Sequence, residues 1–320
     1  MKKEIGISLL LVVLCVVTAI LNPKFISLAN LTNMANLIGL FGIFSIGLGL
    51  VIITGGIDLS VGSMFALCGV LLAMALAEWH WWWPLAVIAA IAVPMFLGLI
   101  HGTLITRMHV QPFIITLCGL LIYRGLARFI AGDGTKGFGN AEGFETLQHI
   151  AKGKLFGLPM PFVILIIVAV VMWFVLHRSI YGRYLFAVGR NEEAARFSGI
   201  NTRWVIASSY IVAGFLAGIS GILIAFYTNS ISPSNHGNFY ELYGIAAAVL
   251  GGCSLRGGEG SIVGIVIGTA LLQVLQNLVN LLGIASSLNF AVMGAVVLIG
   301  VLADQFFKSR TNKKIVNQAK

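Results

Sequence analysis

Apolar runs follow one another along this chain and are separated by short polar stretches. A helix needs about 20 mostly apolar residues to cross roughly 30 Å of hydrocarbon, and most of the runs come close to that length. Because backbone polar groups must be satisfied inside a membrane, we predict an all-α, polytopic transmembrane helical bundle of about ten helices. The predicted helices cover residues 5–21, 37–53, 61–77, 84–106, 113–130, 160–176, 205–226, 242–250, 262–282 and 289–303.

The predicted helix 242–250 is too short to cross the hydrocarbon layer alone. We expect it either to begin a few residues earlier or to form part of a broken or re-entrant helix near 242–260, as transporters often contain. The segments 55–62 and 251–258 share two leading glycines, a leucine and a final glycine at one constant offset. Two interpretations stay open for this similarity, an internal repeat of two halves and a coincidence in a glycine-rich sequence.

The composition agrees with a membrane protein. Of 320 residues, 58% are hydrophobic and only 10% are charged, which is too little polar surface for a globule in water. We therefore expect one transmembrane domain over residues 1–320. The 4 cysteines and 6 histidines show no metal-ligand spacing, so we interpret the cysteines as small buried residues and expect no metal and no cofactor.

The Lys and Arg residues are concentrated in a few polar stretches, and this predicts the orientation of the chain. Cytoplasmic loops of membrane proteins carry an excess of Lys and Arg. We therefore predict cytoplasmic locations for both termini, for the stretch 177–204 and for the tail 305–320, with 131–159 as an external loop. This topology accounts for the net charge of +9 without a nucleic-acid partner.

Three amides lie on one face of the predicted helix 262–282. Gln273, Asn277 and Asn280 follow one another at helical spacing. Amides donate and accept hydrogen bonds, so these residues suit a path for a neutral polyhydroxylated solute. They suit hydrogen bonds between packed helices equally well.

Charged residues at membrane depth form a second candidate set. Arg124 lies about 9 Å from the end of its predicted helix. We expect it to be either a pathway residue or a structural partner of a carboxylate such as Asp58, or of carbonyl groups in a broken helix. Glu241 is a further candidate pathway residue. Because buried carboxylates are few, the sequence argues against a carrier coupled to protons or sodium ions.

No motif for ATP hydrolysis is present. The pattern G-x-x-x-x-G-K-[ST] occurs nowhere in the sequence. No catalytic grouping of Cys, His and Asp can be recognised either. We predict that the chain is not an enzyme.

Four segments in order carry a resemblance to a known family. The segment 54–63, Thr-Gly-Gly-Ile-Asp-Leu-Ser-Val-Gly-Ser, resembles the signature of the permease subunits of ribose-type bacterial ABC importers for carbohydrate uptake, which are similar to branched-chain permeases. The segments 182–201, 240–247 and 250–260 agree with the same family. One departure is Tyr243, which stands where the family usually has an acidic residue.

The resemblance implies a function and a set of partners. It implies a permease in the bacterial inner membrane that moves ribose, another pentose or a related monosaccharide by alternating access. The implied partners are cytoplasmic ATP-binding subunits, a periplasmic sugar-binding protein, membrane lipid and a second permease subunit, with a homodimer as the leading expectation. The residues 131–159 then form a periplasmic loop. The alternative is a stand-alone secondary carrier or channel for a small polar solute.

The resemblance also implies the site of contact with the ATPase. The segment 191–201 matches the cytoplasmic region where family permeases contact the ATP-binding subunit. We expect a short helix over 192–197, capped by Asn191 and ended by Gly199, that seats in a groove of the ATPase. The alternative is a solvated charged loop. The candidate coupling residues are Gly189, Asn191, Glu192, Glu193, Ala194, Ala195, Ser198, Gly199 and Asn201.

Overall fold

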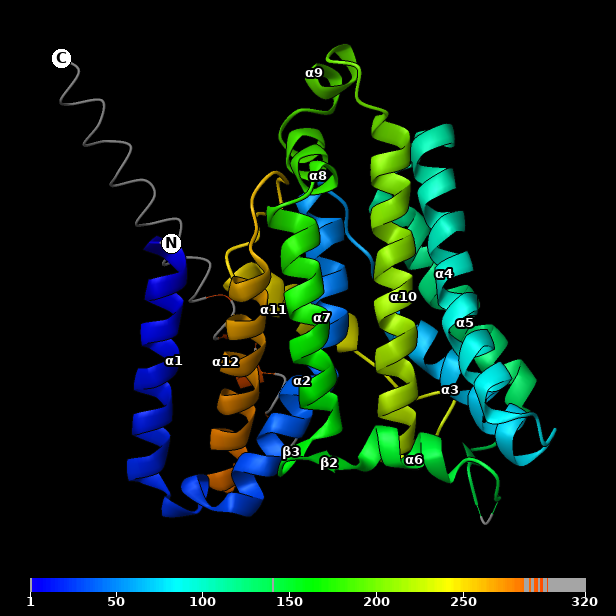
Figure 1. Cartoon of the computed structure of the whole chain (residues 1–320), viewed down its shortest axis with the longest axis vertical. Coiled ribbons are helices and arrows are strands. Elements are labelled where there is room, and N and C mark those ends of the chain that lie inside the picture. Colours follow the sequence, from blue (N-terminus) through cyan, green and yellow to red (C-terminus); the bar gives the residue numbers. More distant parts are fainter. Residues whose placement is uncertain are drawn as a thin grey trace.

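The computed structural model describes residues 2–139 and 141–284, together with residues 288, 291, 292, 294, 295 and 298. The described part is a bundle of long helices (Figure 1). Its helices are α1 (Lys2–Leu21), the 3-10 helix η1 (Pro23–Ile26), α2 (Leu28–Ile53), α3 (Val61–Ala77), α4 (Trp83–Met108), α5 (Pro112–Ala131), α6 (Glu145–Lys152), α7 (Met160–His177), α8 (Ile180–Arg190), α9 (Glu192–Phe197), α10 (Thr202–Thr228), α11 (Tyr240–Leu250) and α12 (Ile262–Leu281). Its short strands are β1 (Lys136–Gly137), β2 (Lys154–Leu155), β3 (Leu158–Pro159) and β4 (Ser230–Ile231).

Among the described residues, 7 helices are long and apolar enough to cross a membrane, namely α1, α2, α4, α5, α7, α10 and α12. The apolar helices α3 and α11 are shorter. These helices confirm the predicted polytopic helical bundle. The predicted helix 289–303 lies almost wholly outside the described residues and the tail 305–320 lies wholly outside them, so the total of about ten helices stays a prediction.

Helix α2 begins at Leu28, so the predicted start at residue 37 is wrong. Ser27 caps the helix, because its Oγ accepts a hydrogen bond of 3.3 Å from the backbone N–H of Asn30. Several asparagines in the first turns dilute the apolar pattern, which is why the pattern alone does not reveal this part of the helix.

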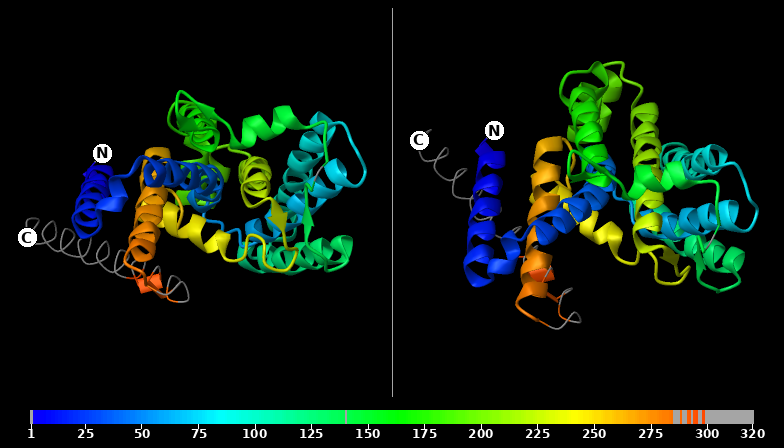
Figure 2. Two further views of the ribbon diagram at one scale, coloured as in Figure 1. Left: turned by 90° about the horizontal axis from the view of Figure 1, so that it is seen from below. Right: turned by 60° about the horizontal axis from the view of Figure 1, so that its bottom comes forward.

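Helices α2 and α10 form the centre of the bundle. Helix α10 packs most extensively against α4 and α2. Close approach of α4 requires glycine, since a Cβ on Gly102 would lie 2.5 Å from the Cα of Ala207 in α10. Helix α1 stands instead at one edge, beside α12 (Figure 2).

The two ends of the bundle differ in structure (Figure 1). Helices α8 and α9 lie at one end, and α6 with the small strands lies at the other. We call these the α9 end and the α6 end. The strands form two antiparallel pairs, β1 with β4 and β2 with β3. Lys136 of β1 pairs with Glu78 at a distance of 2.6 Å, so α3 finishes at the α6 end.

Three non-helical segments interrupt the bundle. They are 54–60 between α2 and α3, 232–239 between β4 and α11, and 251–261 between α11 and α12. Helix α11 has 11 residues and is about 16 Å long at 1.5 Å per residue, so it cannot span a membrane. This agrees with the expectation of a short or broken helix near 242–260. The observed helix begins at Tyr240, slightly earlier than the predicted start.

Candidate functional site

Helix α9 is a helix of 6 residues at one end of the bundle. Asn191 caps its start, because its side-chain oxygen accepts a hydrogen bond of 2.9 Å from the backbone N–H of Ala194. Gly199 follows its end with a φ of 83°, a conformation that glycine adopts without strain. The predicted helix 192–197, with its cap and its stop, is confirmed.

Several candidate coupling residues contact the elements next to α9 or cap them. Glu192 Oε1 accepts a hydrogen bond of 3.1 Å from the hydroxyl of Thr202, at the start of α10. The Asn201 side chain caps α10 by accepting a hydrogen bond of 3.2 Å from the N–H of Trp204. Ala195, within α9, is buried. These contacts orient the helix, and a role in contacting the ATPase stays a prediction.

Phe197 and Glu193 remain exposed on α9. The Phe197 side chain is 84% exposed, and the Arg196 guanidinium carbon lies 5.8 Å from the centre of its ring. Aromatic residues and arginine are enriched at the energetic centres of protein interfaces. Sequence reasoning did not single out Phe197, although a lone aromatic residue within a charged stretch is a usable signal.

Gly189, near the end of α8, lies where three segments meet. A Cβ at this position would overlap the carbonyl of Ile53 and would lie 2.5 Å from the backbone nitrogen of Gly258. The N–H of Gly258 also donates a hydrogen bond of 2.8 Å to the Ile53 carbonyl. The end of α8 therefore contacts both the end of α2 and the turn before α12. Whether 55–62 and 251–258 form a repeat stays a prediction.

Asp58 shapes the interruption between α2 and α3. Its Oδ1 accepts hydrogen bonds from the backbone N–H and the hydroxyl of Ser60, at 2.8 and 2.6 Å. The hydroxyl groups of Thr116 and Tyr210 donate to the carbonyl of Ile57 at 3.2 and 3.5 Å. Asp58 is 2% exposed, so the structure favours a structural role for this carboxylate.

Arg124 binds backbone carbonyls. Its Nη1 donates hydrogen bonds to the carbonyls of Pro233 at 3.0 Å and His236 at 2.7 Å. Its Nη2 donates to the carbonyl of Gly62 at 3.3 Å. The structure thus supports the structural alternative in which Arg124 satisfies the carbonyls of a broken segment. The Glu241 carboxylate, which is 6% exposed, also lies against Gly62.

The three amides of α12 lie apart from Arg124 on α5. Asn277 and Asn30 exchange side-chain hydrogen bonds of 2.7 and 3.1 Å, which join α12 to α2. Gln273 is buried and Asn280 is exposed near the end of α12. Helix α12 packs mainly against α2, α11 and α1, whereas α5 packs mainly against α3. The Asn277 contact supports the helix-packing alternative, and a pathway role for the amides stays a prediction.

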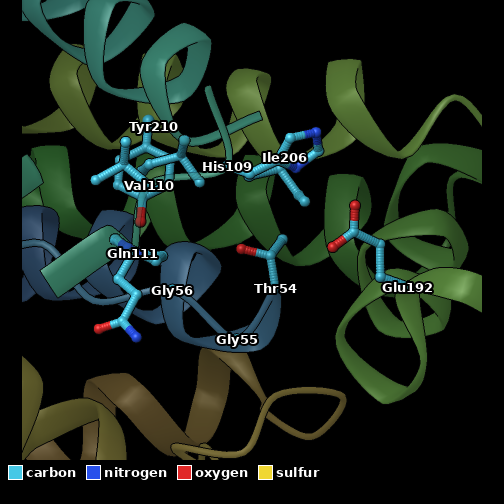
Figure 3. Close-up of a pocket in the computed structure, with 11 residues that line it drawn as sticks. Thr54, Gly55, Gly56, His109, Val110, Gln111, Glu192, Ile206 and Tyr210 are labelled. Carbon is cyan, nitrogen blue, oxygen red and sulfur yellow. The ribbon is translucent and has the colours of Figure 1, made fainter. Parts of the chain in front are cut away.

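A cavity of about 300 Å³ lies at the α9 end. The end of α2, the turn between α4 and α5, α9 and α10 contribute to its walls. Figure 3 shows the side chains of Thr54 and Glu192 projecting toward the same space. Of the candidate residues named from the sequence, only Glu192 lines the cavity. Its polar lining also includes His109, Gln111 and Tyr210.

The membrane-length helices and the broken segments define a multi-pass membrane protein of the transporter type. The sequence matches the family model described as the permease component of branched-chain amino acid transport systems, over residues 30–301. The chain therefore belongs to this family of permease components.

Curated relatives confirm the resemblance to ribose-type permeases. The ribose import permease protein RbsC of Bacillus subtilis (strain 168) is 38% identical over 305 residues, which cover 95% of this chain and 93% of the relative. The protein of the same name from Escherichia coli (strain K12) is 38% identical over 92% of this chain and 91% of its own length. The fructose import permease protein FruF of Bifidobacterium longum (strain NCC 2705) is 33% identical over 79% of this chain and 71% of its own length. No solved structure matches the chain.

Proposed function

We propose that this chain is the membrane-spanning permease subunit of an ATP-binding cassette importer that moves a monosaccharide into a bacterial cell. The observation that carries the proposal is α9, a capped helix at one end of the bundle with Phe197 84% exposed. The chain has no ATP-binding loop of its own in its sequence, so it needs a partner that hydrolyses ATP. Helix α9 offers such a partner a folded, exposed helix to bind.

The α9 end faces the cytoplasm in this proposal. The stretch 177–204, which contains α8 and α9, carries several arginines, and positive charge collects in cytoplasmic loops. The α6 end then faces the outside. Phe156, at the tip of the β2–β3 hairpin, is 97% exposed there and offers a contact for the sugar-binding protein.

The contacts of Gly189 suggest how α9 acts on the membrane part. A movement of α8 and α9 reaches the end of α2 and the segment 251–261 directly, because the end of α8 packs against Ile53 and Gly258. Alternating access requires elements that move together when the ATPase changes state. The cavity beside Glu192 gives the solute a cytoplasmic exit. A second copy of the chain completes the membrane unit as a homodimer.

The proposed solute is ribose, another pentose or a related monosaccharide. Curated relatives are named for the import of ribose, fructose and autoinducer 2. Few carboxylates lie at membrane depth, which suits an uncharged solute. Tyr243 replaces the acidic residue usual in the family, so the solute need not be ribose itself.

Reconstitution in liposomes tests the proposed function. The chain is combined with the ATP-binding and sugar-binding subunits of the same bacterium, and uptake of radiolabelled D-ribose and D-fructose is measured. The proposal expects uptake that requires ATP and all three kinds of subunit. Solute flux through the chain alone, without ATPase subunits, would instead identify a stand-alone carrier or channel and overturn the proposal.

A further inference from the structure

Segment 232–239 is an irregular stretch of backbone that lies deep in the bundle. It contacts α3 at two levels, because Gly69 lies against His236 and Gly62 lies against Gly237. Helix α3 finishes at the α6 end, so Gly62 lies about 22 Å along the helix from that end at 1.5 Å per residue. Within a hydrocarbon layer of about 30 Å, the segment therefore reaches past the middle.

Part of the backbone of this segment is hydrogen-bonded by the protein itself. Turns within the segment form hydrogen bonds from His236 N–H to the Ser232 carbonyl at 2.8 Å and from Asn238 N–H to the Asn235 carbonyl at 3.1 Å. Arg124 donates hydrogen bonds to the carbonyls of Pro233 and His236. Non-helical backbone at membrane depth is tolerated only where it is buried in protein or lines a water-filled cavity.

Three side chains of the same segment are exposed, whereas Pro233 and His236 are buried. Asn235, Asn238 and Phe239 are exposed, with Phe239 at 50%. The amide groups of Asn235 and Asn238 have no hydrogen-bond partner within the part of the chain that the structure describes. Free amides at this depth are costly against lipid tails, so this surface faces water or another protein.

Phe239 also has an unusual backbone conformation. Its φ is 66° and its ψ is 6°, in the left-handed region that bulky residues rarely adopt. Glycine would occupy this position without strain. Backbone strain of this kind concentrates at functional sites, which indicates that the ring itself has a use.

We propose that Asn235, Asn238 and Phe239 line the translocation path and contact the passing solute, an inference that rests on the proposed function. The amides donate and accept hydrogen bonds, so they exchange partners with the hydroxyl groups of a monosaccharide. The Phe239 ring stacks on the apolar face of a sugar ring. Arg124 and Glu241, which are turned to the backbone beneath, keep the segment in place and do not contact the solute.

Thiol labelling tests whether the surface is wet. In a variant in which the native cysteines are replaced, Asn238→Cys or Asn235→Cys is introduced and the assembled complex is placed in liposomes. The charged reagent methanethiosulfonate ethylsulfonate, present on both sides, is expected to modify the new thiol. The matched control is Val12→Cys on α1, a position that is 57% exposed on an apolar helix and should stay unmodified, because a thiol in lipid remains protonated and the charged reagent does not enter the hydrocarbon.

The labelling result separates the alternatives without any transport measurement. Thiols at 235 and 238 that stay unreactive in the complex, while they react in the isolated chain, would show that a second subunit covers the segment. Unreactive thiols in both samples would show that it is dry. Either result overturns the proposed lining, whatever the outcome for ATP-dependent uptake.

Substitution of Phe239 tests contact with the solute. We expect Phe239→Gly to relieve strain and preserve assembly and thermal stability, yet to lower D-ribose or D-fructose uptake about tenfold through loss of a stacking contact. Phe239→Tyr should retain uptake. The control is His80→Gly, an exposed residue with a φ of 53° outside the segment, which should leave uptake unchanged. Full uptake by Phe239→Gly in a complex whose parent is active would overturn the role of the ring, whereas an inactive parent would count against the proposed function.

Discussion

Gly258 donates a backbone hydrogen bond of 2.8 Å to the carbonyl oxygen of Ile53, which joins the turn before α12 to the end of α2. The end of α8 packs onto this bond through Gly189, with no room for a side chain between them. Three segments that are distant in sequence are therefore held together by backbone contacts beneath α9. Under the proposed function, we expect a movement of α8 to displace the end of α2 and the turn before α12, because dense packing transmits displacement.

Gly189→Ala is expected to disturb this junction. The added Cβ would overlap the Ile53 carbonyl, and overpacking of this kind costs about 1–3 kcal/mol. We predict a lower thermal midpoint of the purified chain and less sugar moved per ATP hydrolysed. Gly6→Ala is the control, since nothing lies within 4 Å of a Cβ at that position. Equal midpoints for the two variants would show that α8 is not held tightly here.

Phe197→Ala is expected to weaken binding of the ATP-binding subunit. Truncation of an aromatic residue at the centre of an interface costs about 2 kcal/mol or more, so we predict at least about a thirtyfold higher Kd at unchanged thermal stability. Surface plasmon resonance with immobilised permease measures the Kd. Phe156→Ala, at the opposite end and 97% exposed, should leave it unchanged. If both variants bind like the parent protein, α9 is not the docking element.

Asn191→Ala should destabilise α9 without changing any side chain on its exposed face. Loss of an N-cap costs about 1 kcal/mol, and a helix of 6 residues forms few backbone hydrogen bonds of its own. We predict weaker ATPase binding, which Asn191→Ser restores because serine also caps. Asn201→Ala removes the corresponding cap from the much longer α10 and serves as the comparison. Normal binding by Asn191→Ala would mean that the partner induces the helix.

Asn30 and Asn277 should show energetic coupling. Because their amides exchange two hydrogen bonds, a double-mutant cycle with Asn30→Ala and Asn277→Ala should give about 0.6–1.7 kcal/mol of interaction free energy in membrane-like conditions. The KM for sugar uptake should stay unchanged in Asn277→Ala. A changed KM together with additive stability effects would contradict the packing role and would indicate that Asn277 lies in the solute path.

Arg124→Lys should release the segment 232–239. A guanidinium group spans several carbonyls with a planar fork, whereas a lysine ammonium is a compact point charge. Hydrogen bonds from a charged group contribute about 1.5–3 kcal/mol each, so we predict a clear loss of stability. Hydrogen exchange of the amides in 232–239 checks this, with the α10 amides as internal reference. Parent-like protection in the segment would contradict the assigned role of Arg124.

Local signals allowed part of this structure to be predicted. Helix α9 could be found from Asn191 and Gly199, because a cap and a stop act within a few residues of the helix they bound. The long apolar helices could be found for the same reason, since hydropathy is read along one segment. The start of α2 was missed because its first turns are polar and depend on a serine cap.

Contacts between distant segments were beyond such reasoning. The segment 232–239 has the composition of an ordinary loop, and its depth becomes visible only once Arg124 and Gly62 are placed beside it. For Arg124, the sequence left a choice between carboxylate and carbonyl partners, and the tertiary structure supplies the carbonyls. The contact between Asn30 and Asn277 could not be predicted either, since no local pattern links α2 to α12.

The meeting of Gly62 and Gly237 has a consequence for how such proteins diverge. The contact is made by backbone atoms and leaves no room for a Cβ at either position. The exposed side chains at 235, 238 and 239 are free to vary around it. With the solute lining proposed above, we expect exchange of a few of these side chains to change the cargo without altering the contact between Gly62 and Gly237.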